Sequence, residues 1–178
     1  MMRNNRRLGP CGSFWGITGV LVILGSAVYR LTPLALEVFS YDLLWYHWFS
    51  VCLSLLLMAY AEGYRGFQQR FSPRVAARAK YLADHPRLLH IFLAPIFCMG
   101  YFHATRKRKI TSFSVTAAII VLIVLVRLMH QPWRGIVDLG VVTGLIWGFV
   151  SVLFFGIKAF TSEDFAFSPE VPGGEKVP

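Results

Sequence analysis

Charged residues are scarce in this chain, and their scarcity argues against an ordinary soluble domain. Only 15% of the 178 residues are charged and 56% are hydrophobic, whereas average globular domains have roughly 25% and 45–50%. The hydrophobic residues fall in long, nearly uncharged blocks. A helix that rises about 1.5 Å per residue needs about 20 such residues to cross a hydrocarbon core of about 30 Å. The composition therefore predicts membrane-spanning helices.

Cysteine and catalytic motifs are scarce as well. The three cysteines, Cys11, Cys52 and Cys98, are too far apart for a CxxC metal or redox motif. The sequence contains no HExxH, GxSxG or GxxxxGK[ST] motif, and no serine or cysteine is marked as a nucleophile beside a histidine. We therefore name no catalytic residue and favour a protein that is not an enzyme, although an enzyme stays open.

Four apolar runs predict an all-α, polytopic transmembrane helix bundle over residues 13–160. The expected spans cover about 13–31, 43–61, 110–127 and 138–158. A basic cytoplasmic N-terminal tail (1–12) precedes them, and a flexible acidic C-terminal tail (161–178) follows, because that tail is too polar to bury itself. The first run also fits a cleaved signal peptide, but a first span explains the same features together with the later spans.

A further apolar run, 88–105, raises a conflict over topology. Short cytoplasmic loops carry the excess of Lys and Arg. If 88–105 crossed the membrane, the four cations at 106–109 would lie opposite the six basic residues between 62 and 87. Pro95 also removes a helix hydrogen bond in the middle of the run. We expect a re-entrant or half-buried segment that other helices cover, with five full spans as the alternative.

The basic region between 62 and 87 predicts a ligand site. Glu62 ends the second run and is expected to pair with Arg65, three residues on. Ser72 and Pro73 predict the start of an interfacial basic helix over 73–83, with Ser72 as N-cap. The expected binding residues for a lipid headgroup or another anionic ligand are Glu62, Arg65, Arg70, Arg74, Arg78 and Arg87. For Glu62 and Arg65 themselves, a structural ion pair that ends the span is the favoured interpretation, and the ligand site is the alternative.

Glycines in the last span predict close helix packing. Without β-carbons, the helix can approach a neighbour closely and gain van der Waals contact in the membrane. The neighbour is either a helix of this chain or a second copy, and the glycines of the first span are a candidate partner surface. The stripe consists of Gly140, Gly144, Gly148 and Gly156, and the candidate partners are Gly12, Gly16 and Gly19.

Four histidines are candidate ligands of haem b or of a metal ion. His47 and His130 lie near the outer ends of the second and fourth spans, and His90 and His103 lie near the cytoplasmic side. Two histidines on different helices at one level of the membrane could hold a b-type haem. Histidine is also ordinary at a membrane interface, so we expect no cofactor and keep haem b as the alternative.

Together these patterns predict an integral protein of the plasma membrane or of a bacterial inner membrane, with an undetermined activity. The leading interpretation is a non-catalytic protein that binds anionic lipid, assembles with other membrane subunits, or self-associates through Gly140 and Gly148. The net charge of +9 lies beside apolar spans, so nucleic acid is not expected as a partner. One alternative is a redox protein, linked to haem b or quinone through His47 and His130. The other is a small transporter or channel bordered by Glu62, Arg65, Arg127 and Asp138, of which the last two are expected to pair.

Overall fold

The computed structural model of the chain describes residues 5–85, 88–162, 165 and 167–171. The regular elements in this part of the chain are all helices, which confirms the all-α prediction for it. In chain order they are α1 (Asn5–Leu36), η1 (Glu37–Ser40), α2 (Trp45–Met58), η2 (Ala59–Phe71), α3 (Ser72–Asp84), α4 (Leu88–Phe92), α5 (Ala94–Met99), α6 (Arg106–Arg127) and α7 (Trp133–Thr161).

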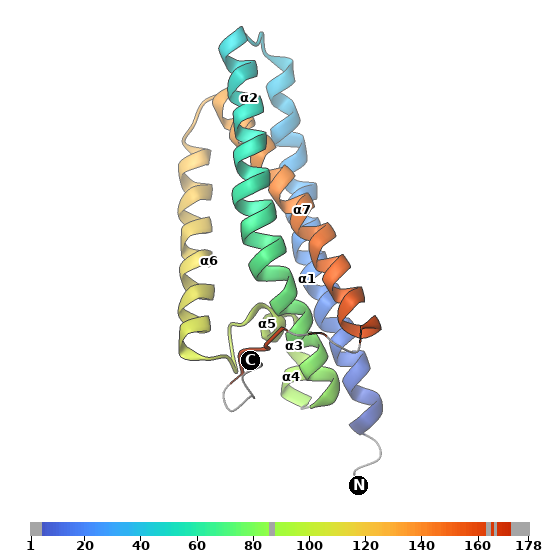
Figure 1. Cartoon of the computed structure of the whole chain (residues 1–178). Helices are drawn as coiled ribbons and strands as arrows, with labels where there is room; N and C mark the ends of the chain where they lie inside the picture. The colour runs from blue at the N-terminus through green and yellow to red at the C-terminus, as the bar shows by residue number, and fades with distance from the viewer. Residues whose placement is uncertain (1–4, 86–87, 163–164, 166, 172–178) are drawn as a thin grey trace.

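The long helices run side by side, and the start of α1 lies at the same end as the end of α7 (Figure 1). We call this the basal end; it also holds α3, α4 and α5. At the opposite, distal end, α1 is followed by α2, and α6 by α7. The start of α6 lies at the basal end, so the cations at 106–109 share an end with α3, as the charge pattern predicted.

Three helical segments are long and apolar enough to cross a membrane: Gly9–Ser40, Arg106–Arg127 and Trp133–Thr161. They correspond to the first, third and fourth predicted spans. The second predicted span differs, because α2 has only 14 residues and continues as the π-helical η2. The residues at both junctions keep right-handed helical angles, so α2, η2 and α3 form one unbroken rod from 45 to 84. The polar residues of η2 end the apolar stretch without ending the helix.

The glycine stripe of α7 packs inside the chain. Gly140 and Gly144 face α2 and η2, and a β-carbon on Gly148 would lie 2.6 Å from the ring of Phe67. Gly156 faces α1, where an added β-carbon would lie 3.4 Å from Ile17. The rod and α1 therefore cover the stripe, and a second copy could reach it only if they moved away.

The glycines of α1 have a different partner from the one expected. Gly12, Gly16 and Gly19 do not face α7. A β-carbon on Gly12 would lie 2.9 Å from the side chain of Ile91, and one on Gly16 would lie 2.8 Å from the sulfur of Cys98. Gly19 faces Pro95. Helices α4 and α5 therefore pack against this column of small residues.

Residues 88–105 form two short helices rather than a span. Leu93 separates α4 from α5, Pro95 lies in the first turn of α5, and Gly100, with φ of +85°, ends it. Phe97 and Cys98 are fully buried against α1 and α3. Proline and a left-handed glycine divide the segment, so no single continuous helix covers it. It is instead half-buried and covered by other helices.

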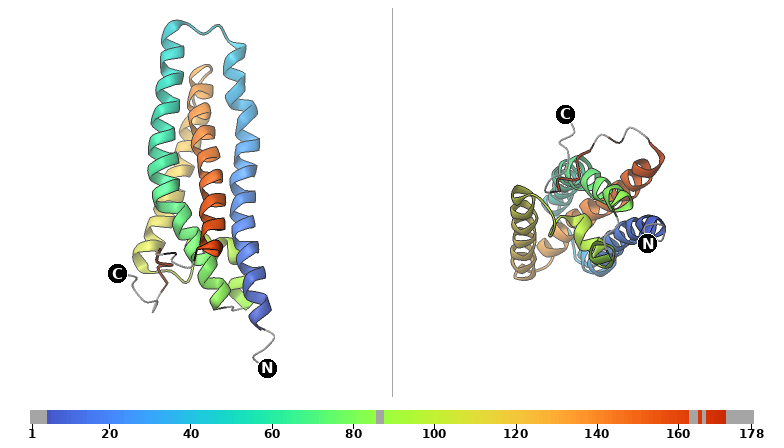
Figure 2. Two further views of the ribbon diagram at one scale, coloured as in Figure 1. Left: turned by 45° about the vertical axis from the view of Figure 1, so that its right-hand side comes forward. Right: turned by 90° about the horizontal axis from the view of Figure 1, so that it is seen from below.

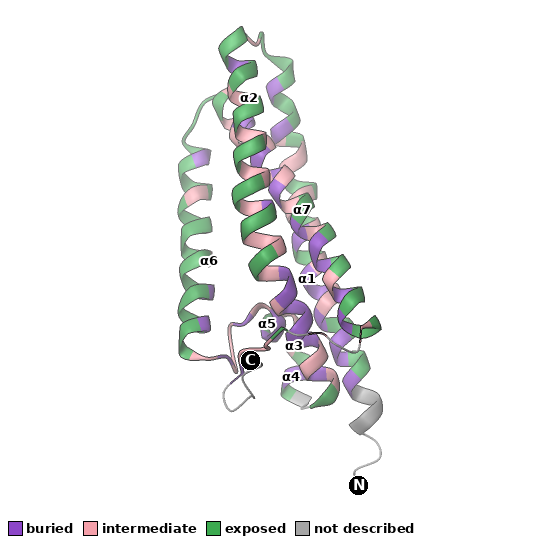
Figure 3. Ribbon diagram, in the orientation of Figure 1, coloured by how far each residue is buried: buried purple, intermediate pink, exposed green. Residues whose placement is uncertain are grey.

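The sixth helix, α6, stands apart from the others. Views from two directions show it beside the group formed by α1, α7 and the rod (Figures 1 and 2). Only Arg108, Ser112 and Val126 of its 22 residues are buried. The buried residues of the molecule gather at the basal end and along α7, whereas most of α6 is exposed (Figure 3). Its buried residues lie in its first two turns and in its last turn.

Candidate functional site

The helix over 73–83 exists as α3, but its surroundings differ from those expected of a helix lying on a membrane surface. Val75, Ala79 and Leu82 are fully buried in a core shared with α1, α5 and α7. No side chain caps the start of α3, and the hydroxyl of Ser72 has no hydrogen-bond partner among the described residues. The N-cap prediction is wrong because η2 runs directly into α3, so there is no helix start to cap.

Arg78, in the middle of α3, lies inside the protein and not at a headgroup surface, since it is only 1% exposed. Its Nε donates to the carbonyl of Phe97 at 2.6 Å, and Nη1 donates to Pro169 at 2.9 Å. Nη2 donates to the carbonyls of Phe102 and His103 at 2.9 and 3.1 Å. The guanidinium carbon also lies 4.2 Å from the centre of the Phe97 ring. Arg78 thus joins α3 to α5, to the loop before α6 and to Pro169, which follows α7.

Burial lowers the pKa of Arg78 to about 10, which still leaves the guanidinium charged at neutral pH. Its acceptors are main-chain carbonyls, which are neutral. The positive charge therefore stays inside the basal end without a carboxylate bonded directly to it. Burial also raises the pKa of the neighbouring Cys98 thiol to about 12, so Cys98 adds no negative charge at neutral pH.

Glu170 bridges two further arginines. Its Oε1 lies 3.3 Å from Nε of Arg74, and its Oε2 lies 3.9 Å from Nε of Arg108. The amide of Thr105 donates to the Glu170 carbonyl at 3.0 Å, and Val171 is buried. We call residues 167–171 the C-terminal segment. The flexible tail expected over 161–178 does not describe it, because these contacts dock it on the basal end, and position 161 belongs to α7.

The described members of the predicted binding set lie in more than one place. Arg74 and Arg78 lie in the basal end, whereas Arg65 and Arg70 are exposed on η2. Arg87 lies outside the described residues. Sequence reasoning missed Arg108, whose inward direction has a visible signal. Arg108, Ser112 and Thr116 recur every four positions on one face of α6, and they contact Glu170, Met99 and Tyr101 respectively.

Glu62 has another neighbour than the one expected. No ion pair joins it to Arg65 within the part of the chain that the structure describes. Its half-buried side chain lies against Gly144, whose added β-carbon would be 3.4 Å from a Glu62 carboxylate oxygen. Further along η2, Gln68 accepts a hydrogen bond of 2.8 Å from the indole of Trp147. Polar side chains therefore run along the middle of α7.

At the distal end, Asp138 pairs with a different arginine from the one predicted. Its Oδ2 lies 3.7 Å from Nε of Arg134, one helical turn earlier in α7, while Arg127 is exposed. The i,i+4 spacing places these two side chains on one face of the same helix. The proposed clasp between α6 and α7 through Arg127 and Asp138 is therefore wrong.

The histidines fall into two places. His47 is buried at the start of α2, where its Nδ1 accepts the Leu44 amide at 3.2 Å and its ring contacts Trp133. His130 is exposed. At the basal end the rings of His90 and His103 lie 4.8 Å apart. Among the described residues no group of three or more His, Cys, Asp or Glu is arranged to hold a metal ion. The haem hypothesis stays a prediction.

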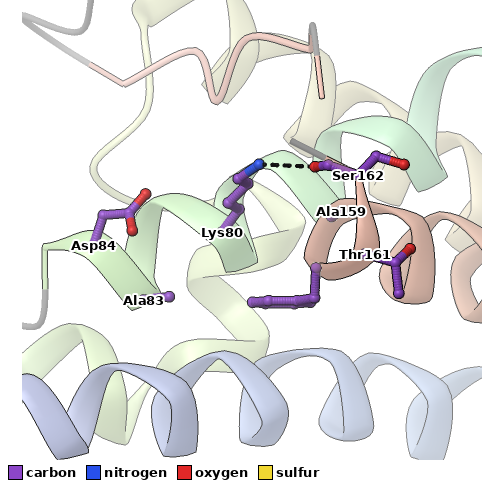
Figure 4. A pocket seen from close by; sticks show the side chains of 7 residues that line it. Lys80, Ala83, Asp84, Ala159, Thr161 and Ser162 are labelled. Atoms are coloured by element: carbon purple, nitrogen blue, oxygen red, sulfur yellow. Dashed lines mark hydrogen bonds between the residues drawn. The ribbon is translucent and has the colours of Figure 1, made fainter. Parts of the chain in front are cut away.

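A shallow pocket of about 350 Å³ opens between α3 and the end of α7 (Figure 4). Lys80 Nζ donates across it to the carbonyl of Ser162 at 3.4 Å, and Asp84 lies at its edge. This contact satisfies a carbonyl at the end of α7 and joins the helix to α3.

Comparisons with family models, curated proteins and solved structures found no match to the chain.

Proposed function

We propose that the chain is an integral membrane protein with four spans and a cytoplasmic basal end. The spans are α1, the rod made of α2 and η2, α6, and α7. Support comes from the three helices of sufficient length and from the unbroken rod, which runs beside α7. The basic residues of α3 and the cation-rich start of α6 share one end, which is the arrangement that cytoplasmic excess of Lys and Arg requires.

Within this membrane protein, we propose that the basal end binds anionic lipid headgroups and carries out no catalysis. The observation that carries the proposal is the first turn of α6. Arg106, Lys107 and Lys109 are exposed there, at the start of a helix whose apolar side chains are almost all exposed too. Cations beside a lipid-facing helix lie at headgroup depth, where each contributes about 1 kcal/mol of attraction to anionic lipid.

Lipid retention tests the proposal. The protein is reconstituted in nanodiscs of phosphatidylcholine with or without phosphatidylglycerol, and the lipids that stay bound are counted by native mass spectrometry. The double variant Arg106→Gln with Lys107→Gln should retain fewer phosphatidylglycerol molecules than the wild type. The matched control removes two exposed cations near the distal end, Arg30→Gln with Arg127→Gln, and should retain as many as the wild type. Equal retention in all three proteins would contradict the proposal.

Ion-coupled transport is a second candidate, and Glu62 is the observation that favours it. Glu62 is fifteen residues after His47, about 22 Å along the rod, so the proposed topology puts a carboxylate within the bilayer. Such carboxylates are costly and commonly mark ion or proton pathways. In proteoliposomes with an internal pH dye, the wild type should then conduct protons after an external pH jump, and Glu62→Gln should not. Wild-type vesicles no faster than empty vesicles would eliminate this candidate.

A further inference from the structure

We propose that Arg74 and Arg108 form a binding site for a phosphate group, and that the carboxylate of Glu170 fills this site when the C-terminal segment is docked. The phosphate has two sources, the headgroup of a lipid or a soluble phosphomonoester. The lipid source rests on the proposed function, because it requires the basal end to lie at a membrane surface. The soluble source does not.

The geometry of the two arginines suits an anion larger than a carboxylate. Arg74 comes from α3 and Arg108 from the first turn of α6, and each directs its Nε to a different oxygen of Glu170. The distance of 3.9 Å from Arg108 is too long for a hydrogen bond. The side chain of Arg108 is only 7% exposed, and its Nε is buried with no acceptor among the described residues. A buried charged donor aimed at an anion it does not quite reach indicates room for additional acceptor oxygens.

The charge balance points the same way. Three guanidinium groups, those of Arg74, Arg78 and Arg108, lie close enough to interact, and among the described residues Glu170 supplies one negative charge against their three positive charges. The hydrogen bonds of Arg78 all go to neutral carbonyls. A phosphomonoester carries about −1.5 to −2 charges and three acceptor oxygens, and arginine forks match such oxygens well. A phosphate would therefore balance this cluster better than a carboxylate does.

The Glu170 carboxylate occupies the arginine site in a way that allows another anion to replace it. Its φ of +50° lies in the left-handed region, which costs energy for a residue other than glycine. Its side chain is 33% exposed, as is that of Arg74, so an anion in solution or at a headgroup can approach the pair. The main-chain bonds of the segment go to Arg78 and Thr105. The carboxylate can therefore be replaced while these bonds persist.

The soluble arm of the test uses the full chain in detergent micelles, with glycerol 3-phosphate as the probe and isothermal titration calorimetry as the measurement. Glu170→Gln should raise the affinity about tenfold, because the wild-type site is competent only while the carboxylate is away from it. Arg108→Ala should abolish the binding. The matched control is Arg127→Ala, which removes an exposed arginine from the other end of the same helix and should leave the affinity unchanged.

A second variant covers the case in which Arg108→Ala does not fold. Arg74→Ala removes the more exposed half of the pair and should also abolish binding, with helicity checked by circular dichroism. The lipid arm repeats the comparison in nanodiscs with and without phosphatidic acid, counting bound lipid. A gain for Glu170→Gln with glycerol 3-phosphate identifies a soluble ligand, and a gain only with phosphatidic acid identifies a lipid.

No gain for Glu170→Gln in either arm overturns the proposed site, as does a gain that persists in the double variant of Glu170→Gln with Arg74→Ala. These outcomes are separate from failure of the proposed lipid-binding function. That function fails when the exposed pair Arg106 and Lys107 proves unimportant for phosphatidylglycerol retention. The soluble arm does not depend on that result.

Discussion

The last two long helices are similarly apolar and yet packed in opposite ways. In α7, 39% of the most apolar stretch is buried, against 11% in α6. The difference follows from small residues, because α7 has glycine at four positions on one face and α6 has none between Arg106 and Arg127. Apolar side chains gain little by leaving lipid for another helix, so close backbone approach decides the packing. Hydropathy thus identifies a candidate span, whereas glycine spacing identifies the face on which it packs closely.

The largest expected effect comes from removing the buried arginine that ties the start of α6 to the bundle. Arg78→Leu would leave the carbonyls of Phe97, Phe102, His103 and Pro169 without their donor. We expect a loss of about 3–5 kcal/mol of stability, because several buried carbonyls lose their donor and each unsatisfied group costs about 1–3 kcal/mol. The measurement is thermal unfolding in one detergent.

The matched control for this prediction is Arg70→Leu, which removes an exposed cation from η2. Its unfolding midpoint should stay near that of the wild type, since exposed charges contribute little. If Arg78→Leu and Arg70→Leu unfold at the same temperature, the basal network does not hold the start of α6 in place.

The next effect tests the comparison itself, by adding the same side chain to each helix. Gly148→Leu would bring its first atom within 2.6 Å of the Phe67 ring, and overpacking of this kind costs about 1–3 kcal/mol or more. Ala118→Leu adds the same residue to an exposed position of α6 and should change the unfolding midpoint little. Equal losses from the two variants would mean that α6 is packed in the protein as α7 is.

The smallest effect concerns a single hydrogen bond between α6 and α5 at the basal end. Ser112 donates to the carbonyl of Met99 at 3.2 Å. Ser112→Ala should cost about 1 kcal/mol, the typical net value of one hydrogen bond. Ser114→Ala, an exposed serine two residues on, is the control and should cost nothing measurable. A reversed order of the two midpoints would contradict the inward direction of this face.

The architecture followed from the sequence to a large extent, because it depends on run length and on chain breakers. The long apolar runs correspond to α1, α6 and α7, and Pro95 with the clustered cations correctly opposed a span over 88–105. The rod was harder to foresee. Its apolar run ends at the polar residues of η2, but the helix continues, since backbone hydrogen bonds do not depend on side-chain polarity.

The basal site was predicted only in part, because the partners of its arginines are main-chain carbonyls. Nothing in a sequence marks where the carbonyls of positions 97, 102 and 103 converge, so Arg78 was assigned to a headgroup surface instead of the interior. Arg108 stands among three other cations in the first turn of α6, so only its i,i+4 spacing to Ser112 relates it to the inward face. The pairing of Glu62 with Arg65 failed for another reason, namely that Gly144 offers space to the carboxylate.

Labelling with a membrane-impermeant thiol reagent in intact cells tests the central claim of four spans most directly. Single cysteines replace Asp42, Lys107 and His130, three exposed positions, in a background with Cys11→Ser and Cys52→Ser. Four spans with a cytoplasmic basal end predict labelling at positions 42 and 130, and at 107 only after the cells are lysed. Positions 42 and 107 labelled from the same side would show that the rod does not cross the membrane, and would contradict the account.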